Sequence, residues 1–132
     1  MSWPEVFAVL VVSHLTGDFL VQTEWQAVNK FGGLARGGPG ARRALLTHVA
    51  TYTLCFAPAF VWIASEIGWN VVWVAALVAV PHLLQDDGRA LIAYLRRVKR
   101  SDAAPGDAVF VMTDQSFHVV VLFAISLATA AA

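Results

Sequence analysis

The sequence predicts an all-α integral membrane protein, a bundle of four membrane-spanning helices, and two observations lead to this prediction. Of its 132 residues, 58% are hydrophobic and only 14% are charged, against about 45–50% and about 25% in ordinary soluble domains. A chain this short cannot enclose so many apolar side chains in its own core, because small domains bury only a modest share of their surface. The apolar residues also gather in four stretches, each near the roughly 20 residues that a helix needs to cross hydrocarbon.

Polar, basic or glycine-rich segments separate the expected spans. The segment 29–43 combines several glycines and a proline with basic residues, which is typical of a loop. A short turn around Gly68 follows the second span, and a second basic segment, 96–107, follows the third. The expected helices, all in one transmembrane domain of residues 1–132, lie at about 4–26, 43–65, 69–95 and 108–130.

The basic residues predict the orientation of the chain in the membrane. All nine lysines and arginines lie in the segment 29–43 or between residues 89 and 100. Because Lys and Arg mark cytoplasmic loops, we expect both basic loops in the cytoplasm and both termini outside. Nine acidic residues balance the nine basic ones, so nucleic acid is not an expected partner.

Each expected span contains polar side chains that do not belong in lipid. All four histidines lie inside spans. An ionised Asp at the centre of a span costs about 2.5–3.5 kcal/mol, so three of them approach ~10 kcal/mol unless they face one another or water. The polar residues are His14 and Asp18 in the first span, His48 in the second, His82 and Asp86 in the third, and Asp114 and His118 in the fourth.

The spacing of these residues predicts that they converge. Three His/Asp pairs are separated by four positions, which places both members of a pair on one helix face, one turn apart. Since successive spans run in opposite directions, the three carboxylates fall in one layer on the cytoplasmic side of their histidines. We therefore expect the seven side chains to face one another inside the bundle.

Imidazoles and carboxylates at one depth are suitable ligands for zinc, iron or manganese, and facing helices of a bundle build such sites. We expect one or two divalent ions, with zinc preferred over iron and manganese, bound by all seven residues. Asp18, Asp86 and Asp114 are also the candidate catalytic residues, one of them as the general base for a bound water. Gln22 lies one turn after Asp18 on the first helix face, and Arg89 lies seven residues after His82 on the third. Gln22 is a candidate substrate-binding residue, and Arg89 and Lys30 are candidates to hold a substrate phosphate or carboxylate.

These motifs resemble a small bacterial and phage membrane family known as domain of unknown function 3307. The similarity covers nearly the whole chain and implies a multi-pass protein of a bacterial-type inner membrane. Where members have a lysine a turn after the third-helix Asp, this chain has Arg89, which keeps the charge. The resemblance also adds Gln115 to the substrate-binding candidates. The shared motifs are His14-x-x-x-Asp18-Phe19-x-x-Gln22 followed by Lys30, then His82-x-x-x-Asp86, and Asp114-Gln115-x-x-His118.

We expect a metal-dependent hydrolase acting on a membrane-associated or lipid-linked ester, phosphoester or amide. Two other functions use the same residue types. One is a pathway for protons or a transported cation, formed in a homo-oligomer because four helices offer little room for a pathway. The other is a non-catalytic membrane interaction protein in which the polar layer only fixes helix pairing.

Overall fold

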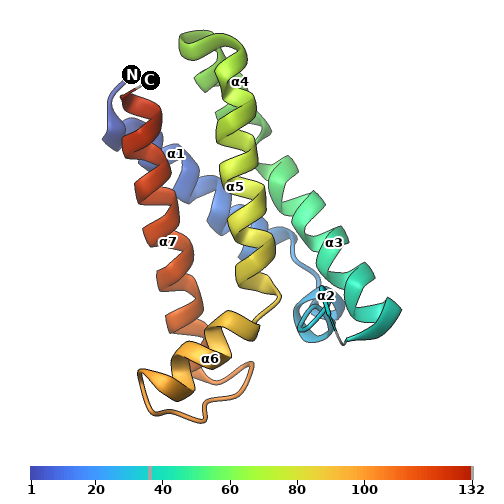
Figure 1. Ribbon diagram of the computed structural model, residues 1–132. Helices are drawn as coiled ribbons and strands as arrows, with labels where there is room; N and C mark the ends of the chain where they lie inside the picture. Colours follow the sequence, from blue (N-terminus) through green and yellow to red (C-terminus); the bar gives the residue numbers. More distant parts are fainter. Residues whose placement is uncertain (36, 132) are drawn as a thin grey trace.

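The computed structural model describes residues 1–35 and 37–131, and all regular secondary structure in these ranges is helical, which confirms the predicted all-α class (Figure 1). Arg36, which belongs to the first basic segment, and Ala132 lie outside the described residues. The elements are α1 (Trp3–Leu15), the π-helix η1 (Thr16–Val21), α2 (Glu24–Asn29), α3 (Gly38–Cys55), α4 (Ala57–Ile67), the 3-10 turn η2 (Gly68–Asn70), α5 (Val71–Asp86), α6 (Arg89–Arg97) and α7 (Ala108–Ala130).

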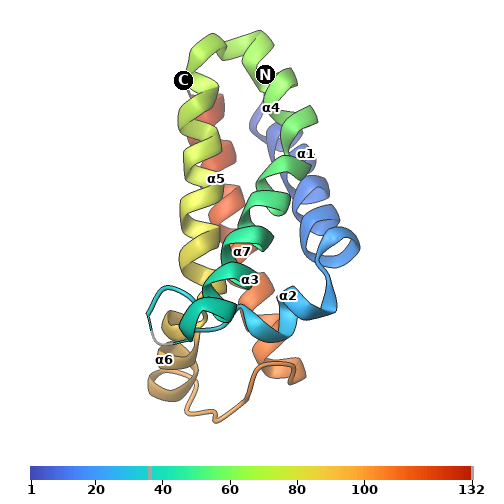
Figure 2. The same ribbon diagram turned by 90° about the vertical axis from the view of Figure 1, so that its right-hand side faces the viewer.

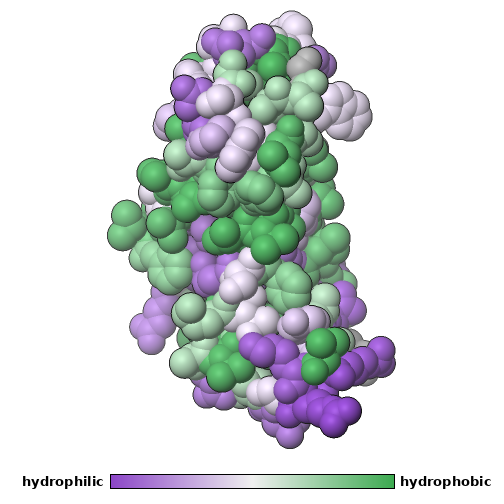
Figure 3. All heavy atoms as spheres, turned by 90° about the vertical axis from the view of Figure 1, so that its left-hand side faces the viewer, coloured by the Kyte–Doolittle hydropathy of each residue, from purple (hydrophilic) through white to green (hydrophobic). Residues whose placement is uncertain are grey.

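Three helical stretches are long and apolar enough to cross a membrane: Trp3–Val21, Ala57–Asp86 and Ala108–Ala130. Large apolar side chains on these helices are exposed, among them Phe19, Trp73 and Val120. Figure 3 shows such side chains covering the middle of one face, with hydrophilic ones at both ends and more of them at the lower end. A surface of this kind is compatible with a membrane protein.

The stretch Ala57–Asp86 is a hairpin of two helices. Gly68 has a φ of 59°, a left-handed conformation that L side chains rarely adopt, and the chain reverses there (Figure 2). As a result α4 lies beside α5 and continues the path of α3. The expected helix at 43–65 differs accordingly: it begins earlier, at Gly38, and is interrupted at Phe56, just before Pro58 in the first turn of α4.

Two expected spans end earlier than predicted. The first, 4–26, stops at Val21, and a separate short helix α2 starts after Thr23, whose hydroxyl caps it by accepting the Gln26 N–H at 3.3 Å. The third, 69–95, stops at Asp86, because Gly88 takes a φ of 75° and α6 then leads away from the axis of α5. The fourth expected helix, 108–130, coincides with α7.

The π-helix η1 brings α1 and α3 together beside the polar residues. Its widened turn is shown by the bond from the Gln22 N–H to the Gly17 carbonyl, five residues back, at 3.1 Å. A Cβ on Gly17 would lie only 2.6 Å from Cδ2 of Tyr52 on α3. Only glycine therefore allows this close approach, and π-turns are frequent at functional sites.

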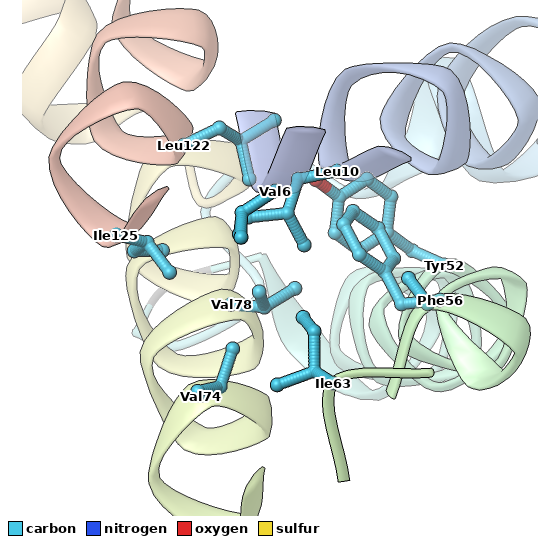
Figure 4. Close-up of a cluster of buried hydrophobic side chains, with 10 residues drawn as sticks. Val6, Leu10, Tyr52, Phe56, Ile63, Val74, Val78, Leu122 and Ile125 are labelled. Atoms are coloured by element: carbon cyan, nitrogen blue, oxygen red, sulfur yellow. The ribbon is translucent and has the colours of Figure 1, made fainter. Parts of the chain in front are cut away.

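The polar side chains lie between two apolar clusters. The larger cluster packs α1, α4, α5 and α7 near the end where the termini meet, with Val6, Leu10, Ile63, Val78 and Leu122 at its centre (Figure 4). A smaller cluster of Leu91, Leu95 and Phe110 joins α6 to the start of α7. Hydrophobic packing thus lies on both sides of the polar layer along the bundle.

Candidate metal centre

The structure brings all seven predicted His and Asp side chains into one buried cluster. The four histidines and Asp86 are almost fully buried, Asp18 is 8% exposed, and the Asp114 side chain is partly accessible. Each residue has a nitrogen or carboxylate oxygen within 3.7 Å of another member. α1, η1, α3, α5 and α7 all contribute, as the spacing of the pairs predicted.

The tightest group consists of His48, His82 and Asp86. The Nε2 atoms of the two histidines are 3.1 Å apart, and they lie 2.8 and 3.3 Å from Oδ2 of Asp86. Oδ1 of Asp18 lies beside this group, 3.3 Å from Nε2 of His48 and 3.7 Å from Nε2 of His82. Among the described residues, Asp18 forms a separate candidate ligand group with His82 and His118.

The separations among His48, His82 and Asp86 fit three ligands of a tetrahedral metal ion. A metal-ligand distance of about 2.1 Å places neighbouring ligand atoms about 3.4 Å apart, and the three distances in this group run from 2.8 to 3.3 Å. Four buried atoms of the cluster have no hydrogen-bond partner among the described residues: Asp18 Oδ1, His48 Nδ1, Asp86 Oδ1 and His118 Nε2. Unpartnered buried polar atoms are costly, and a cation bound between the carboxylates and imidazoles would relieve part of that cost.

His118 extends the group towards Asp114. Its Nδ1 lies 3.3 Å from Nδ1 of His82, and its Nε2 lies 3.3 Å from Oδ1 of Asp86 and 3.5 Å from Oδ2 of Asp114. In a hydrogen bond between these two Nδ1 atoms, one nitrogen carries the hydrogen and the other accepts it. If His82 binds metal through Nε2, its Nδ1–H points at His118, whose Nε2–H then faces the two carboxylates. Asp86, Asp114 and His118 also form a second group that could hold an ion.

A family model described as "Protein of unknown function (DUF3307)" matches residues 6–132. The chain belongs to the DUF3307 family. The match confirms the resemblance stated above, and every residue of the polar cluster lies within it. No curated protein and no solved structure matches the chain significantly.

His14 of this DUF3307 protein lies in the cluster but faces other partners. Its Nδ1 is 3.1 Å from the Tyr52 hydroxyl and its Nε2 is 3.0 Å from Oε1 of Gln115, whose amide nitrogen reaches Asp18 at 3.4 Å. His14 is absent from the ligand groups found among the described residues. Its place beside Asp18 suits a residue that orients a ligand, a frequent role of groups around metal sites.

Tyr52 is a site residue that the sequence analysis did not single out. Its ring stacks on the His82 imidazole, with centroids 3.4 Å apart and planes 3° from parallel, and its hydroxyl meets His14. The ring therefore fixes the orientation of a candidate ligand. The signal was available, because Tyr52 follows His48 by four residues and so shares its helix face.

Gln22 and Lys30, two of the expected substrate-binding residues, also reach the cluster. The Gln22 amide nitrogen lies 3.0 Å from Nε2 of His48. Lys30, at the end of α2, is 7% exposed, and its ammonium group lies 2.7 Å from Oδ2 of Asp86. A protein cation therefore already neutralises the carboxylate at the centre of the candidate metal group.

Arg89 lies apart from the cluster. Its guanidinium pairs with Asp87, and its side chain is 58% exposed. Asp87 itself is buried, and its Oδ1 accepts the Leu34 N–H at 2.8 Å while its carbonyl accepts the Gly32 N–H at 2.9 Å. Asp87 and Arg89 thus attach the loop after α2 to the start of α6.

Proposed function

We propose that this DUF3307 protein is a multi-pass protein of a bacterial-type inner membrane, a four-helix bundle with both termini outside, that hydrolyses a membrane-associated substrate with one divalent metal ion. The observation that supports this proposal is the buried set of three ligand atoms from His48, His82 and Asp86, with Asp18 beside it. The exposed hydrophobic side chains of the spans, together with the basic residues near α2, the start of α3 and α6 at the end opposite the termini (Figure 1), support the topology.

In this proposal His48, His82 and Asp86 hold the ion, and zinc suits two imidazoles and a carboxylate. A bound zinc ion lowers the pKa of a coordinated water, so that hydroxide is available at neutral pH. Asp18, whose Oδ1 lies 3.3 Å from Nε2 of His48 and 3.7 Å from Nε2 of His82, would be the general base that takes a proton from water. His118 receives the hydrogen bond of His82 and connects it to Asp114, while His14 and Gln115 orient Asp18.

Hydrolysis is a better fit than transport because of what lies beside the cluster. Towards the termini, the larger apolar cluster occupies the space between the helices with side chains such as Leu10, Ile63 and Val78. A proton or cation passing through a single chain would have to cross this packing. A pocket reached from one side, as the partly accessible Asp114 indicates, suits an enzyme.

Metal analysis of the detergent-purified full chain tests the proposal. We expect about one zinc per chain, and His82→Gln should lose it. His14→Gln is the matched control: this histidine is equally buried and hydrogen-bonded, yet its replacement should leave zinc bound. Two ions per chain would indicate that Asp86, Asp114 and His118 form a second site. Absence of metal from protein prepared with excess zinc, or equal loss in both variants, would contradict the assignment.

Hydrolysis itself needs a separate assay. Zinc-loaded protein should cleave members of a panel of membrane-soluble esters, amides and phosphoesters, and His82→Gln should abolish this activity. A flux of protons or zinc into liposomes that depends on Asp18, without hydrolysis, would favour the transport function instead.

A further inference from the structure

A cavity of about 400 Å³ adjoins the candidate metal centre. It lies between η1, α2 and the first turns of α7, at the end of the molecule opposite the termini (Figure 2). Its volume is at the lower end of the range of about 300–1,000 Å³ that is usual for small-molecule sites. The cavity therefore has room for one small ligand or one chain of a lipid.

The cavity has one polar wall and one apolar wall. Asp18, Gln22, Lys30, Asp114 and Gln115 form the polar wall, which is part of the candidate metal centre. The apolar wall consists of hydrophobic side chains from the same three elements, including Phe19, Val28, Phe110 and Val111. This combination suits an amphiphile whose polar group meets the metal centre and whose hydrocarbon chain contacts the apolar wall.

The apolar wall continues onto the outer surface of the molecule. Phe19 is 57% exposed and Val28 is 68% exposed, so both side chains line the cavity and are also part of the exposed hydrophobic surface. In the proposed topology this region lies near the cytoplasmic face of the bilayer. An occupant can therefore enter sideways from the lipid without crossing water.

The charges around the polar wall select the kind of head group. With one dication bound, the charges of Asp18, Asp86 and Asp114 are balanced by that ion and by Lys30. A phosphate group would add negative charge that nothing in the described part of the wall compensates, and an uncompensated charge at this depth is costly. An uncharged carbonyl group adds none, and the amides of Gln22 and Gln115 can donate hydrogen bonds to it.

We propose that this cavity binds a single-chain fatty acyl ester, with its uncharged ester group at the metal centre and its acyl chain against Phe19, Val28 and Val111. The assignment rests on the proposed hydrolase function and narrows its substrate class. In the reaction, water adds its oxygen to the ester carbonyl carbon, and the acyl carbon–oxygen bond breaks. The proton that Asp18 takes from water passes to the leaving alkoxide, so the products are a fatty acid and an alcohol.

Native mass spectrometry of the zinc-loaded full chain in an ester-free detergent tests the assignment with two probes. Monolauroylglycerol offers an uncharged ester, whereas dodecyl phosphate offers the same chain length with an anionic head. We expect one monolauroylglycerol per chain, bound at least tenfold more tightly than dodecyl phosphate, and slow release of laurate. Equal or tighter binding of dodecyl phosphate would overturn the charge argument and the assignment.

Filling the cavity provides the second arm of the test. Val111→Trp should weaken monolauroylglycerol binding at least tenfold with zinc content unchanged, and Val28→Trp on the facing helix should do the same. Val120→Trp is the matched control, since Val120 is also an exposed valine of α7 but lies outside the cavity. Unchanged binding in both cavity variants would overturn the assignment.

The zinc content distinguishes a failure of the substrate class from a failure of the proposed hydrolase function. Protein that retains zinc in the cluster but binds no monolauroylglycerol would refute the substrate class alone. Protein that binds no zinc would refute the proposed function, and the substrate class with it.

Discussion

The ion pair between Lys30 and Asp86 leads to an unusual prediction, namely that removing a charged residue from the site strengthens metal binding. The Lys30 ammonium group lies 2.7 Å from the same Asp86 oxygen that completes the tightest ligand group. Lysine and metal therefore compete for one carboxylate. In Lys30→Met, which keeps most of the side-chain volume, the competing cation is gone.

The size of the effect follows from the geometry. Two unit charges at this distance attract by about 6 kcal/mol at an effective dielectric constant of 20, and desolvation offsets much of that. Hydrogen bonds to charged groups contribute about 1.5–3 kcal/mol net. A metal that displaces Lys30 must overcome this amount, so Lys30→Met should tighten zinc binding by about 10- to 150-fold. Without metal, the loss of the Lys30 cation beside the buried Asp86 carboxylate should lower the free energy of unfolding by about 3–5 kcal/mol.

Two measurements on detergent-purified protein check this prediction. Competition with a chromophoric chelator gives the zinc affinity, and tryptophan fluorescence on heating gives the apparent Tm. We expect Lys30→Met to have a lower Tm than the native chain without zinc and a larger increase in Tm when zinc is added. Lys99→Met is the control, because Lys99 bonds Thr113 at 3.1 Å, away from the ligand group. A zinc affinity in Lys30→Met that falls or stays at the native value would refute the competition.

Three further variants test the packing around the site. Gly17→Ala would place a Cβ 2.6 Å from the Tyr52 ring, which stacks on His82, so we expect about 1–3 kcal/mol lower stability on chemical unfolding together with weaker zinc binding. Unchanged zinc affinity would show that the close approach at Gly17 is not needed to hold His82. Tyr52→Phe removes the 3.1 Å hydrogen bond to His14 but keeps the stacked ring, so the free energy of unfolding should fall by about 1 kcal/mol while the zinc content stays the same. Loss of zinc would mean that the hydroxyl is itself a ligand. Ile63→Ala opens a hole in the larger apolar cluster and should cost about 2–5 kcal/mol without changing the zinc stoichiometry, and a loss of zinc would show that the two regions are coupled.

Local periodicity explains why much of the polar cluster could be predicted. Residues four apart on a helix share a face whatever the helix packs against, so the pairs of His14 with Asp18 and of His82 with Asp86 could be recognised without a structure. The cost of burying charge in lipid then required these faces to turn inward. The contacts of Asp18 and Asp86 with His48, at 3.3 and 2.8 Å, agree with that reasoning.

The helix ends were harder to predict because they depend on partners distant in the sequence. Apolar composition alone extended the first span beyond Val21 and the third beyond Asp86. The structure ends both helices where the chain must pack against something else. Gly88 turns beside the ring of Phe31, 2.5 Å from where its Cβ would lie, and α2 places Lys30 against Asp86. Neither contact leaves a local signal in hydrophobic periodicity.

By itself, the sequence determined the all-helical class, the family and the set of side chains that must avoid lipid, because composition and a fixed helical repeat are properties of the chain. Only the tertiary structure decided which atoms of that set face one another. It placed His48, His82 and Asp86 around one point, turned His14 towards Tyr52 and Gln115, and left Arg89 with Asp87. These choices depend on the π-turn at Gly17 and on how α3 packs against it, and packing between distant segments is a property of the folded molecule.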